Sequence, residues 1–596
     1  MLISRESRLC TFLLVILFGL VVLAVALDLT LGILLQANTS PILSSTLVSV
    51  PAASATLLPQ PESNFVLRSI QDELPRTRSY EFTVGTVKGA PDGVERQMLV
   101  VNGMYPGPTI EANQGDRILV TVKNNLPNRT SIHWHGLYQN STPWYDGTMA
   151  VTECGIPPGN SLTYNFTFGQ FFGTTWWQKW REDLTAFIAG MQYTDGVTGA
   201  IVVHPTRNVS GIPSWDEDLA VQLADWYHTF SEELLALYMR PNIGIDGTPG
   251  DEPVPDSLTI NGLGQYGGGG EYFNFTVQRG KIYRLRILNT GSFASIKFSV
   301  DGHPLTLIEA DSTPTSPIVV SSVTVAVAQR YSVLLTADAT SNPGGLYWMR
   351  AEMQTDMFRY QQPGQNTDVR AVLRYARTYS DVPFRAVPEK SSSLDPAGLP
   401  SIDGKTELVP LQGGPPPDAT VAYYLQYSFQ KTSAHQFLGF MNKTSWEPLQ
   451  RDATLFSVQR DPSGSAPQGA SVKHEQFIIA EDSVQVVDLY ISSLDDGDHP
   501  FHLHGHAPWI MASGKGRYIG QSVSNRNPFY RDTYLIPAYS WMALRFVTNN
   551  PGLWAFHCHI QWHMAAGLMM QFAVQPSTLA KWTVPEELLA QCSAVS

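Results

Sequence analysis

Seven residues near the end of the chain, His557-Cys558-His559-Ile560-Gln561-Trp562-His563, carry the side chains best suited to redox chemistry. Because a trigonal blue-copper centre is built from one thiolate and two imidazoles, Cys558 and His563 are predicted to supply two of its three equatorial ligands. Leu568, the tenth residue after the cysteine, falls where a weak axial ligand would lie. On an extended strand, His557 and His559 point to the face opposite Cys558. His557 and His559 can therefore serve a second metal site. Because both are bonded neighbours of Cys558, two covalent backbone paths would connect that site to the first metal.

Two further segments concentrate histidine. The stretch His499-Pro500-Phe501-His502-Leu503-His504-Gly505-His506 holds four imidazoles, and His133-Trp134-His135-Gly136 adds two. Nine of the 14 histidines therefore lie in three short segments. With these motifs the chain resembles the multicopper oxidases, and among them the fungal laccase-like enzymes, over residues 78 to 578.

This resemblance implies four coppers, which take single electrons from a phenol or aromatic amine and reduce dioxygen to water. The implied ligands are His499, Cys558 and His563 for the type 1 copper, His133 and His502 for the type 2 copper, and His135, His504, His557 and His559 for the type 3 pair. His506 matches a family histidine that is not a ligand. Since Leu568 cannot coordinate, we expect a raised potential at the type 1 copper. The neighbouring Met569 and Met570 are out of register and are expected in the core.

The chain departs from the family at the second His-x-His pair of type 3 ligands. Its flanks are present at 173–177 and 192–196, but between them the chain reads Gln178-Lys179-Trp180, and the segment 178–190 is longer than in the family. The charges in this segment would be costly beside copper unless paired. Two explanations stay open. Either an intron boundary is misplaced in the translated gene, or the protein is genuine and its type 3 pair lacks two imidazoles.

Two carboxylates are candidates for proton transfer through the resemblance. Asp146 matches a family acid near the type 2 copper that delivers protons to reduced oxygen; alternatively it is an ordinary turn aspartate before glycine. Asp225 matches a laccase position at the phenol pocket, where a carboxylate accepts the substrate's proton; alternatively it caps a turn. His204, His228 and His303 have no ligand spacing and are expected to be structural.

The composition and the leader, the N-terminal segment of residues 1–36, indicate which partners and which cellular compartment to expect. A net charge of −13 and a pI near 5.5, without a basic stripe, argue against a nucleic-acid partner. In residues 1–36, Arg5 and Arg8 precede the apolar run 11–35, which reads either as a secretory signal or as an uncleaved signal anchor in the membrane. The rest of the chain would then be lumenal or extracellular. Seven glycosylation sequons fit this, at Asn38, Asn128, Asn140, Asn165, Asn208, Asn274 and Asn442.

Four cysteines are present, and two of them, Cys154 and Cys592, are left after Cys10 in the leader and Cys558. In an oxidising compartment these two can pair. The resemblance supports the pairing, because laccases carry a cysteine at the position of Cys154 that is bridged to one near the C-terminus. Such a disulfide bond would tie the first domain to the C-terminal tail.

Short alternating strands bounded by Gly, Pro and Asn predict an all-β fold of three cupredoxin-like Greek-key β-sandwich domains. An internal repeat supports this, because residues 114–124 match 279–289, with a weaker third copy at 484–491. The predicted segments are a low-complexity stalk at 37–77, domains at 78–207, 212–376 and 420–578, a linker at 380–418 and a tail at 579–596. Since the first and third domains supply all the ligands, the cluster is expected at their interface.

Competing functions remain within and beyond this chemistry. Iron oxidases of the family carry a carboxylate where Thr194 stands, and ascorbate oxidases usually carry an axial methionine where Leu568 stands. Both observations weigh against these two activities without excluding them. An alternative from another functional class is a copper-binding or electron-transfer protein whose cluster is defective. Dioxygen consumption would separate this protein from the oxidases.

Overall fold

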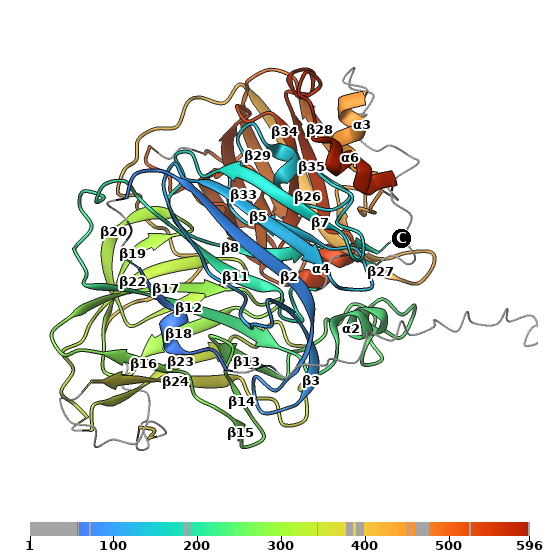
Figure 1. Ribbon diagram of the computed structural model, residues 1–596. Coiled ribbons are helices and arrows are strands. Elements are labelled where there is room, and N and C mark those ends of the chain that lie inside the picture. Colours follow the sequence, from blue (N-terminus) through green and yellow to red (C-terminus); the bar gives the residue numbers. More distant parts are fainter. Residues whose placement is uncertain are drawn as a thin grey trace, which may run out of the picture. The chain divides into compact units, whose positions relative to one another are not determined.

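The computed structural model describes residues 57, 59–68, 70, 73–180, 182–183, 188–189, 192–342, 344–376, 386–388, 398–449, 452–460, 476–523 and 526–593. Strands predominate over helices and form three domains, each built from two sheets (Figure 1). This is the all-β cupredoxin architecture that the sequence predicts.

The first domain packs two four-stranded sheets around one core. One sheet has the order β3-β2-β5-β7, with strands β2 (Thr77–Gly89), β3 (Arg96–Val101), β5 (Arg117–Asn124) and β7 (Ser161–Thr167). The other has the order β4-β11-β8-β6, with strands β4 (Ile110–Asn113), β6 (Ser131–Trp134), β8 (Gly173–Trp180) and β11 (Thr198–His204). Every second residue of β5 is buried, as expected of a strand with one face on a core. The short helix η2 (Pro143–Tyr145) and the ladder of β9 (Glu182–Asp183) with β10 (Ile188–Ala189) complete the domain.

The second domain has a seven-stranded and a six-stranded sheet. The first has the order β1-β12-β17-β22-β19-β20, with β13 also paired to β12, and contains β1 (Val66–Leu67), β12 (Glu217–Trp226), β13 (Ser257–Ile260), β17 (Ile282–Asn289), β19 (Leu305–Ala310), β20 (Thr313–Val320) and β22 (Arg330–Thr336). The second has the order β16-β24-β23-β18-β21-β25 and contains β16 (Asn274–Val277), β18 (Ile296–Val300), β21 (Ser322–Val325), β23 (Leu346–Met353), β24 (Asp368–Tyr375) and β25 (Ser401–Ile402). Helix α2 (Ser231–Tyr238) and the hairpin β14 (Gln265–Tyr266) to β15 (Gly269–Gly270) lie between strands.

The third domain has two five-stranded sheets. The order β27-β26-β29-β33-β31 joins β26 (Val421–Lys431), β27 (Phe437–Met441), β29 (Val486–Ser493), β31 (Trp509–Lys515) and β33 (Ser540–Val547). The order β28-β35-β34-β30-β32 joins β28 (Ile478–Glu481), β30 (His499–Leu503), β32 (Thr533–Ile536), β34 (Gly552–Cys558) and β35 (Met569–Val574). Its helices are α3 (Thr454–Arg460), α4 (Gln561–Ala565), α5 (Pro576–Leu579) and α6 (Glu586–Ser593).

The predicted internal repeat occupies the same place in each domain. Strands β5, β17 and β29 each pair in parallel with an earlier strand and antiparallel with a later one. In the first two copies the closing asparagine has the same bonds. Oδ1 of Asn124 accepts from the backbone N–H of Leu126, and Oδ1 of Asn289 accepts from that of Gly291, both at 2.9 Å. The repeated Asn therefore fixes the turn that follows the strand.

The end of the predicted stalk is structured, which corrects the sequence-based boundary at residue 77. Helix η1 (Glu62–Asn64) leads into β1 (Val66–Leu67), which pairs with β12 of the second domain. Phe65 and Leu67 are buried there, so this segment has an apolar surface to cover. The predicted linker likewise adds β25 (Ser401–Ile402) to the second domain. The apolar leader lies outside the described residues, and no helix among those described is long and apolar enough to cross a membrane.

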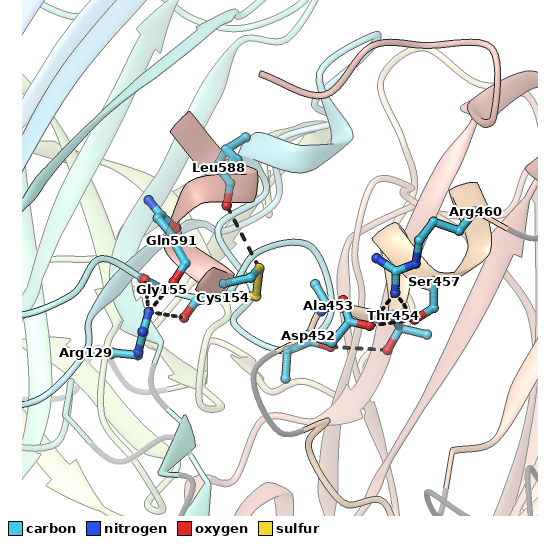
Figure 2. The surroundings of a disulfide bond; sticks show 12 residues. Arg129, Cys154, Gly155, Asp452, Ala453, Thr454, Ser457, Arg460, Leu588 and Gln591 are labelled. Atoms are coloured by element: carbon cyan, nitrogen blue, oxygen red, sulfur yellow. Dashed lines mark hydrogen bonds and ion pairs between the residues drawn. A yellow bond between two sulfur atoms is a disulfide. The ribbon is translucent and has the colours of Figure 1, made fainter. Parts of the chain in front are cut away.

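The first and third domains share a hydrophobic core and a covalent link. Trp446, Leu553 and Leu588 pack with strands of the first domain. The predicted disulfide bond between Cys154 and Cys592 is present and fastens helix α6 to the first domain (Figure 2). Beside it, Arg129 donates to the carbonyl of Gln591 at 2.9 Å. These contacts hold the two ligand-bearing domains together.

Candidate copper centres

His499, Cys558 and His563 converge in the third domain, as the resemblance implies. His499 begins β30, Cys558 ends β34, and His563 lies in α4. Sγ of Cys558 is 3.5 Å from Nδ1 of His499 and 3.6 Å from Nδ1 of His563, and the two nitrogens are 3.1 Å apart. These separations suit three donors about 2.0–2.3 Å from one ion. The residues present therefore fit a trigonal copper.

The chemistry of the thiol agrees with this fit. Burial raises the pKa of the Cys558 thiol, but hydrogen bonds with His499 and His563 lower it from 9.0 to about 7. A thiolate is the form that binds metal. Leu568 is fully buried near this set, and its carbonyl accepts from the Cys558 N–H at 3.2 Å. Met569 and Met570 lie in hydrophobic cores, in agreement with the sequence-based prediction.

Two carboxylates contact the outer edges of the two predicted type 1 histidines. Nε2 of His499 lies 2.9 Å from Oδ2 of Asp495, and Nε2 of His563 lies 2.8 Å from Oε1 of Glu252. Sequence reasoning missed both residues. Asp495 precedes a ligand by one helical turn's spacing, a signal that could have been noticed, but Glu252 lies in a loop of the second domain without any motif. The middle domain therefore contributes a side chain to the site.

Six buried imidazoles gather on the other side of Cys558, at the interface of the first and third domains. They are His133, His135, His502, His504, His557 and His559. His502 lies opposite His557 in the register of β30 and β34. Strand alternation turns His557 away from Cys558, as predicted. The ring centroids of His133 and His504 are 4.1 Å apart, and those of His135 and His502 are 3.9 Å apart.

Burial keeps these imidazoles neutral, which is the form that binds metal. Desolvation lowers the pKa of His133 to about 4 and that of His504 to about 3. The pKa values of the other four are lowered in the same direction, again first by burial.

Two aspartates orient these imidazoles. Oδ2 of Asp146 lies 2.8 Å from Nδ1 of His504, and its backbone carbonyl lies 2.8 Å from Nδ1 of His133. Oδ1 of Asp532 lies 3.0 Å from Nε2 of His135, and Asp532 is itself paired with the buried Arg330 of the second domain. Carboxylates of this kind fix the tautomer of ligating histidines. Asp146 is thus at the cluster, while Asp532 and Arg330 were not foreseen.

Gln178 and Trp180, which replace the second His-x-His pair of the family pattern, lie beside the cluster imidazoles. In the pairing of β6 with β8, Gln178 lies opposite His133 and Trp180 opposite Ser131. Nε2 of Gln178 is 3.3 Å from Nε2 of His559. The Trp180 ring centroid lies 5.2 Å from that of His557.

The position of Lys179 corrects the expectation that its charge lies beside copper. It is buried between Gln178 and Trp180 in β8, and strand alternation turns it to the opposite face, which it shares with the core residue Trp177. Its charge is therefore not directed at the ligands. The side chains of residues 181–191 lie outside the described residues.

The structure shows which groups contact the predicted substrate-binding residue Asp225. Its buried carboxylate accepts backbone N–H bonds of 2.7 to 2.8 Å from Ser292, Phe293 and Ala294. These bonds give Asp225 a role in fixing that turn, so a role toward substrate stays a prediction.

His506, His204, His228 and His303 were predicted to be structural, and each has a hydrogen-bond partner in the protein. Nδ1 of His506 bonds to the carbonyl of His504 at 3.1 Å. His204, His228 and His303 bond to Glu111, Asp92 and Tyr375 respectively.

Comparison with known proteins agrees with this architecture. Three family models, each described as multicopper oxidase, match residues 83–208, 217–378 and 444–578. Laccase-1 of Cryptococcus neoformans is 32% identical, covering 91% of this chain and 87% of its own length. The iron transport multicopper oxidase fetC of Epichloe festucae is also 32% identical, covering 88% of this chain and 81% of its own length.

Two solved structures are also similar. The crystal structure of Fet3p, a multicopper oxidase that functions in iron import, is 26% identical with a TM-score of 0.74, covering 87% of this chain and 94% of that one. The Botrytis aclada laccase is 28% identical with a TM-score of 0.71, covering 88% and 92%. The fold and the ligand sets define a copper-dependent oxidoreductase of the class that uses dioxygen. The chain belongs to the multicopper oxidase family and is laccase-like.

Proposed function

We propose that this protein removes single electrons from phenols or aromatic amines at a type 1 copper held by His499, Cys558 and His563, with dioxygen as the family's acceptor. The observation that carries the proposal is the contact of Glu252 with His563, whose ring also provides a type 1 donor. A carboxylate there can accept the proton that a phenol loses when it gives up an electron. We propose Glu252 as a proton acceptor in addition to Asp225, whose role toward substrate stays a prediction.

Copper bound at this set would supply one-electron chemistry, and the chain connects it to the cluster. Cys558 lies between His557 and His559, so a short covalent route leads from the thiolate to each imidazole. We propose that Asp146 holds a proton at the cluster. Burial raises the pKa of Asp146, and its Oδ1 has no hydrogen-bond partner among the described residues. The family implies four coppers, and we propose fewer here because Gln178 and Trp180 replace two imidazoles.

A second candidate is oxidation of ferrous iron. It is favoured by the pairing of both type 1 histidines with carboxylates, Asp495 and Glu252, because two carboxylates suit a hard divalent cation. A phenol needs only one proton acceptor. Ascorbate oxidation has no corresponding feature among the described residues. An electron-transfer protein that does not reduce dioxygen is the third candidate.

Anaerobic reduction of the type 1 copper distinguishes these donors, because it does not require the second cluster. The copper-loaded protein is mixed with a phenol or with ferrous iron, and bleaching of the thiolate-to-copper band is followed. Faster bleaching by the phenol, little affected by Asp495→Asn, supports the laccase-like activity. Faster bleaching by ferrous iron, with loss in both Asp495→Asn and Glu252→Gln, supports the second candidate and refutes the first.

We also propose a secretory route for the protein. The disulfide bond between Cys154 and Cys592 is typical of oxidising compartments, and the sequons fit the same route. Whether the leader acts as a signal peptide or a membrane anchor is tested by the N-terminal sequence of the purified protein.

A further inference from the structure

Three of the six cluster imidazoles each have one ring nitrogen fixed and the other free. Nδ1 of His133 and Nδ1 of His502 lie 2.8 Å from the backbone carbonyls of Asp146 and Asp532, and Nε2 of His135 lies 3.0 Å from the Asp532 carboxylate. A nitrogen bonded to an oxygen acceptor must carry the proton. The opposite nitrogen of each ring therefore carries a lone pair.

Those lone pairs have no partner among the described residues. Nε2 of His133, Nδ1 of His135 and Nε2 of His502 are buried and make no hydrogen bond there. One ring nitrogen from each of these residues lies within 4.8 Å of the other two. Because buried polar atoms without partners are rare, three such nitrogens on three residues that approach one another this closely indicate a cation. Three imidazoles are a ligand set that copper prefers.

The other half of the cluster is filled differently. Nε2 of His504 and Nε2 of His557 are 3.1 Å apart and face the indole of Trp180, whose centroid lies 5.8 Å and 5.2 Å from their rings. An indole offers only an N–H donor and no lone pair to a metal. Trp180 therefore fills the place of a third ligand with an apolar ring.

The position beside His559 also offers a weaker ligand for copper. Its Nε2 contacts the amide of Gln178 at 3.3 Å, where the family has a further imidazole. An amide is a poorer ligand for copper than an imidazole. The residues present therefore do not fit a three-copper cluster.

We propose that His133, His135 and His502 hold a single copper in place of that cluster, and that Trp180 closes the position between His504 and His557. The protein would then hold two coppers, this one and the type 1 copper. The assignment is independent of the electron donor, because the type 1 band and the signal of the second copper are recorded separately.

The test uses the full chain as printed, loaded with copper and dialysed. Copper analysis should give about two ions per chain, and electron paramagnetic resonance should detect all of them, since no coupled pair is present. A matched pair of variants then locates the second copper. His135→Ala should abolish the non-blue signal and leave the blue band, whereas His504→Ala should leave both.

A retained blue band shows that each variant is folded, and His135→Gln offers a milder change with the same expected loss. Combining Gln178→His with Trp180→His should add copper that is silent in paramagnetic resonance. The proposal is overturned if the unaltered chain holds a silent copper pair. It is also overturned if the non-blue signal is lost in His504→Ala and kept in His135→Ala.

Discussion

Oε1 of Glu252 lies 2.8 Å from Nε2 of His563, although 311 residues separate them in the chain. This contact places a proton acceptor on the outer edge of a type 1 histidine. We predict that Glu252→Gln slows anaerobic reduction of the type 1 copper by a phenol roughly 100-fold, at the lower end of the range for a lost general base. The blue band should persist, because the proposed donor of His563 is Nδ1. Stopped-flow mixing measures the rate.

Asp251→Asn is the matched control for that variant, since Asp251 is the adjacent acid in the same loop. In this variant, the phenol should reduce the type 1 copper at nearly the same rate as in the unaltered protein. Equal rates in Glu252→Gln and the unaltered chain would remove Glu252 from the proposed mechanism.

The pKa of Glu153 predicts that the stability of the protein depends on pH. Burial raises its pKa from 4.5 to about 8, so the folded protein binds a proton that the unfolded chain releases above pH 4.5. This coupling lowers stability as the pH rises from 4.5 to 8. Glu153→Gln should therefore be more stable than the unaltered protein at pH 8, by roughly 1–3 kcal/mol, and little different at pH 4.5. Thermal unfolding at both pH values measures this, and an equal change at both would contradict it.

Removing the disulfide bond should loosen the C-terminal end of the chain. The bridge spans 438 residues, and the closed-loop model gives an upper estimate of roughly 4–6 kcal/mol for its contribution to stability. The double variant Cys154→Ser with Cys592→Ser should unfold at lower temperature and expose helix α6 to protease. Peptide mapping without reduction should recover the 154–592 pair from the unaltered protein. Free thiols at both positions would contradict the structure.

The motifs, together with the family resemblance, predicted which histidines and which cysteine lie close together, and the structure brings them together in two groups. Alternation along a strand already separates Cys558 from His557, and the structure places them accordingly. The internal repeat in the sequence marks the same strand in each domain, since β5, β17 and β29 each pair in parallel with an earlier strand and antiparallel with a later one.

Long-range contacts could not be predicted in this way. Glu252 and Arg330 belong to the second domain, and only its packing against the third brings them to His563 and Asp532. The backbone partners of Asp225 could not be predicted either. Its motif was visible, but the backbone N–H groups of residues 292–294 that occupy its carboxylate lie in a different part of the sequence.

The segment after Trp177 leads to a prediction about the coding sequence of the gene. Intact family flanks surround a long charged segment, so we predict that the transcript across residues 177 to 191 encodes a His-x-His pair. Sequencing the cDNA tests this. A message that encodes Gln178-Lys179-Trp180 would refute a misplaced intron boundary and make the altered cluster the native one.

Dioxygen consumption by the chain as printed is the most direct test of the account. His499, Cys558 and His563 are all in place, whereas Gln178 and Trp180 stand where two cluster imidazoles are needed. The purified protein should therefore be blue, hold well under four coppers, and consume little dioxygen with a phenol donor. Restoring histidine at 178 and 180 and removing the excess residues should raise both copper content and turnover. Full copper content with rapid dioxygen consumption in the unaltered chain would contradict the ligand assignments.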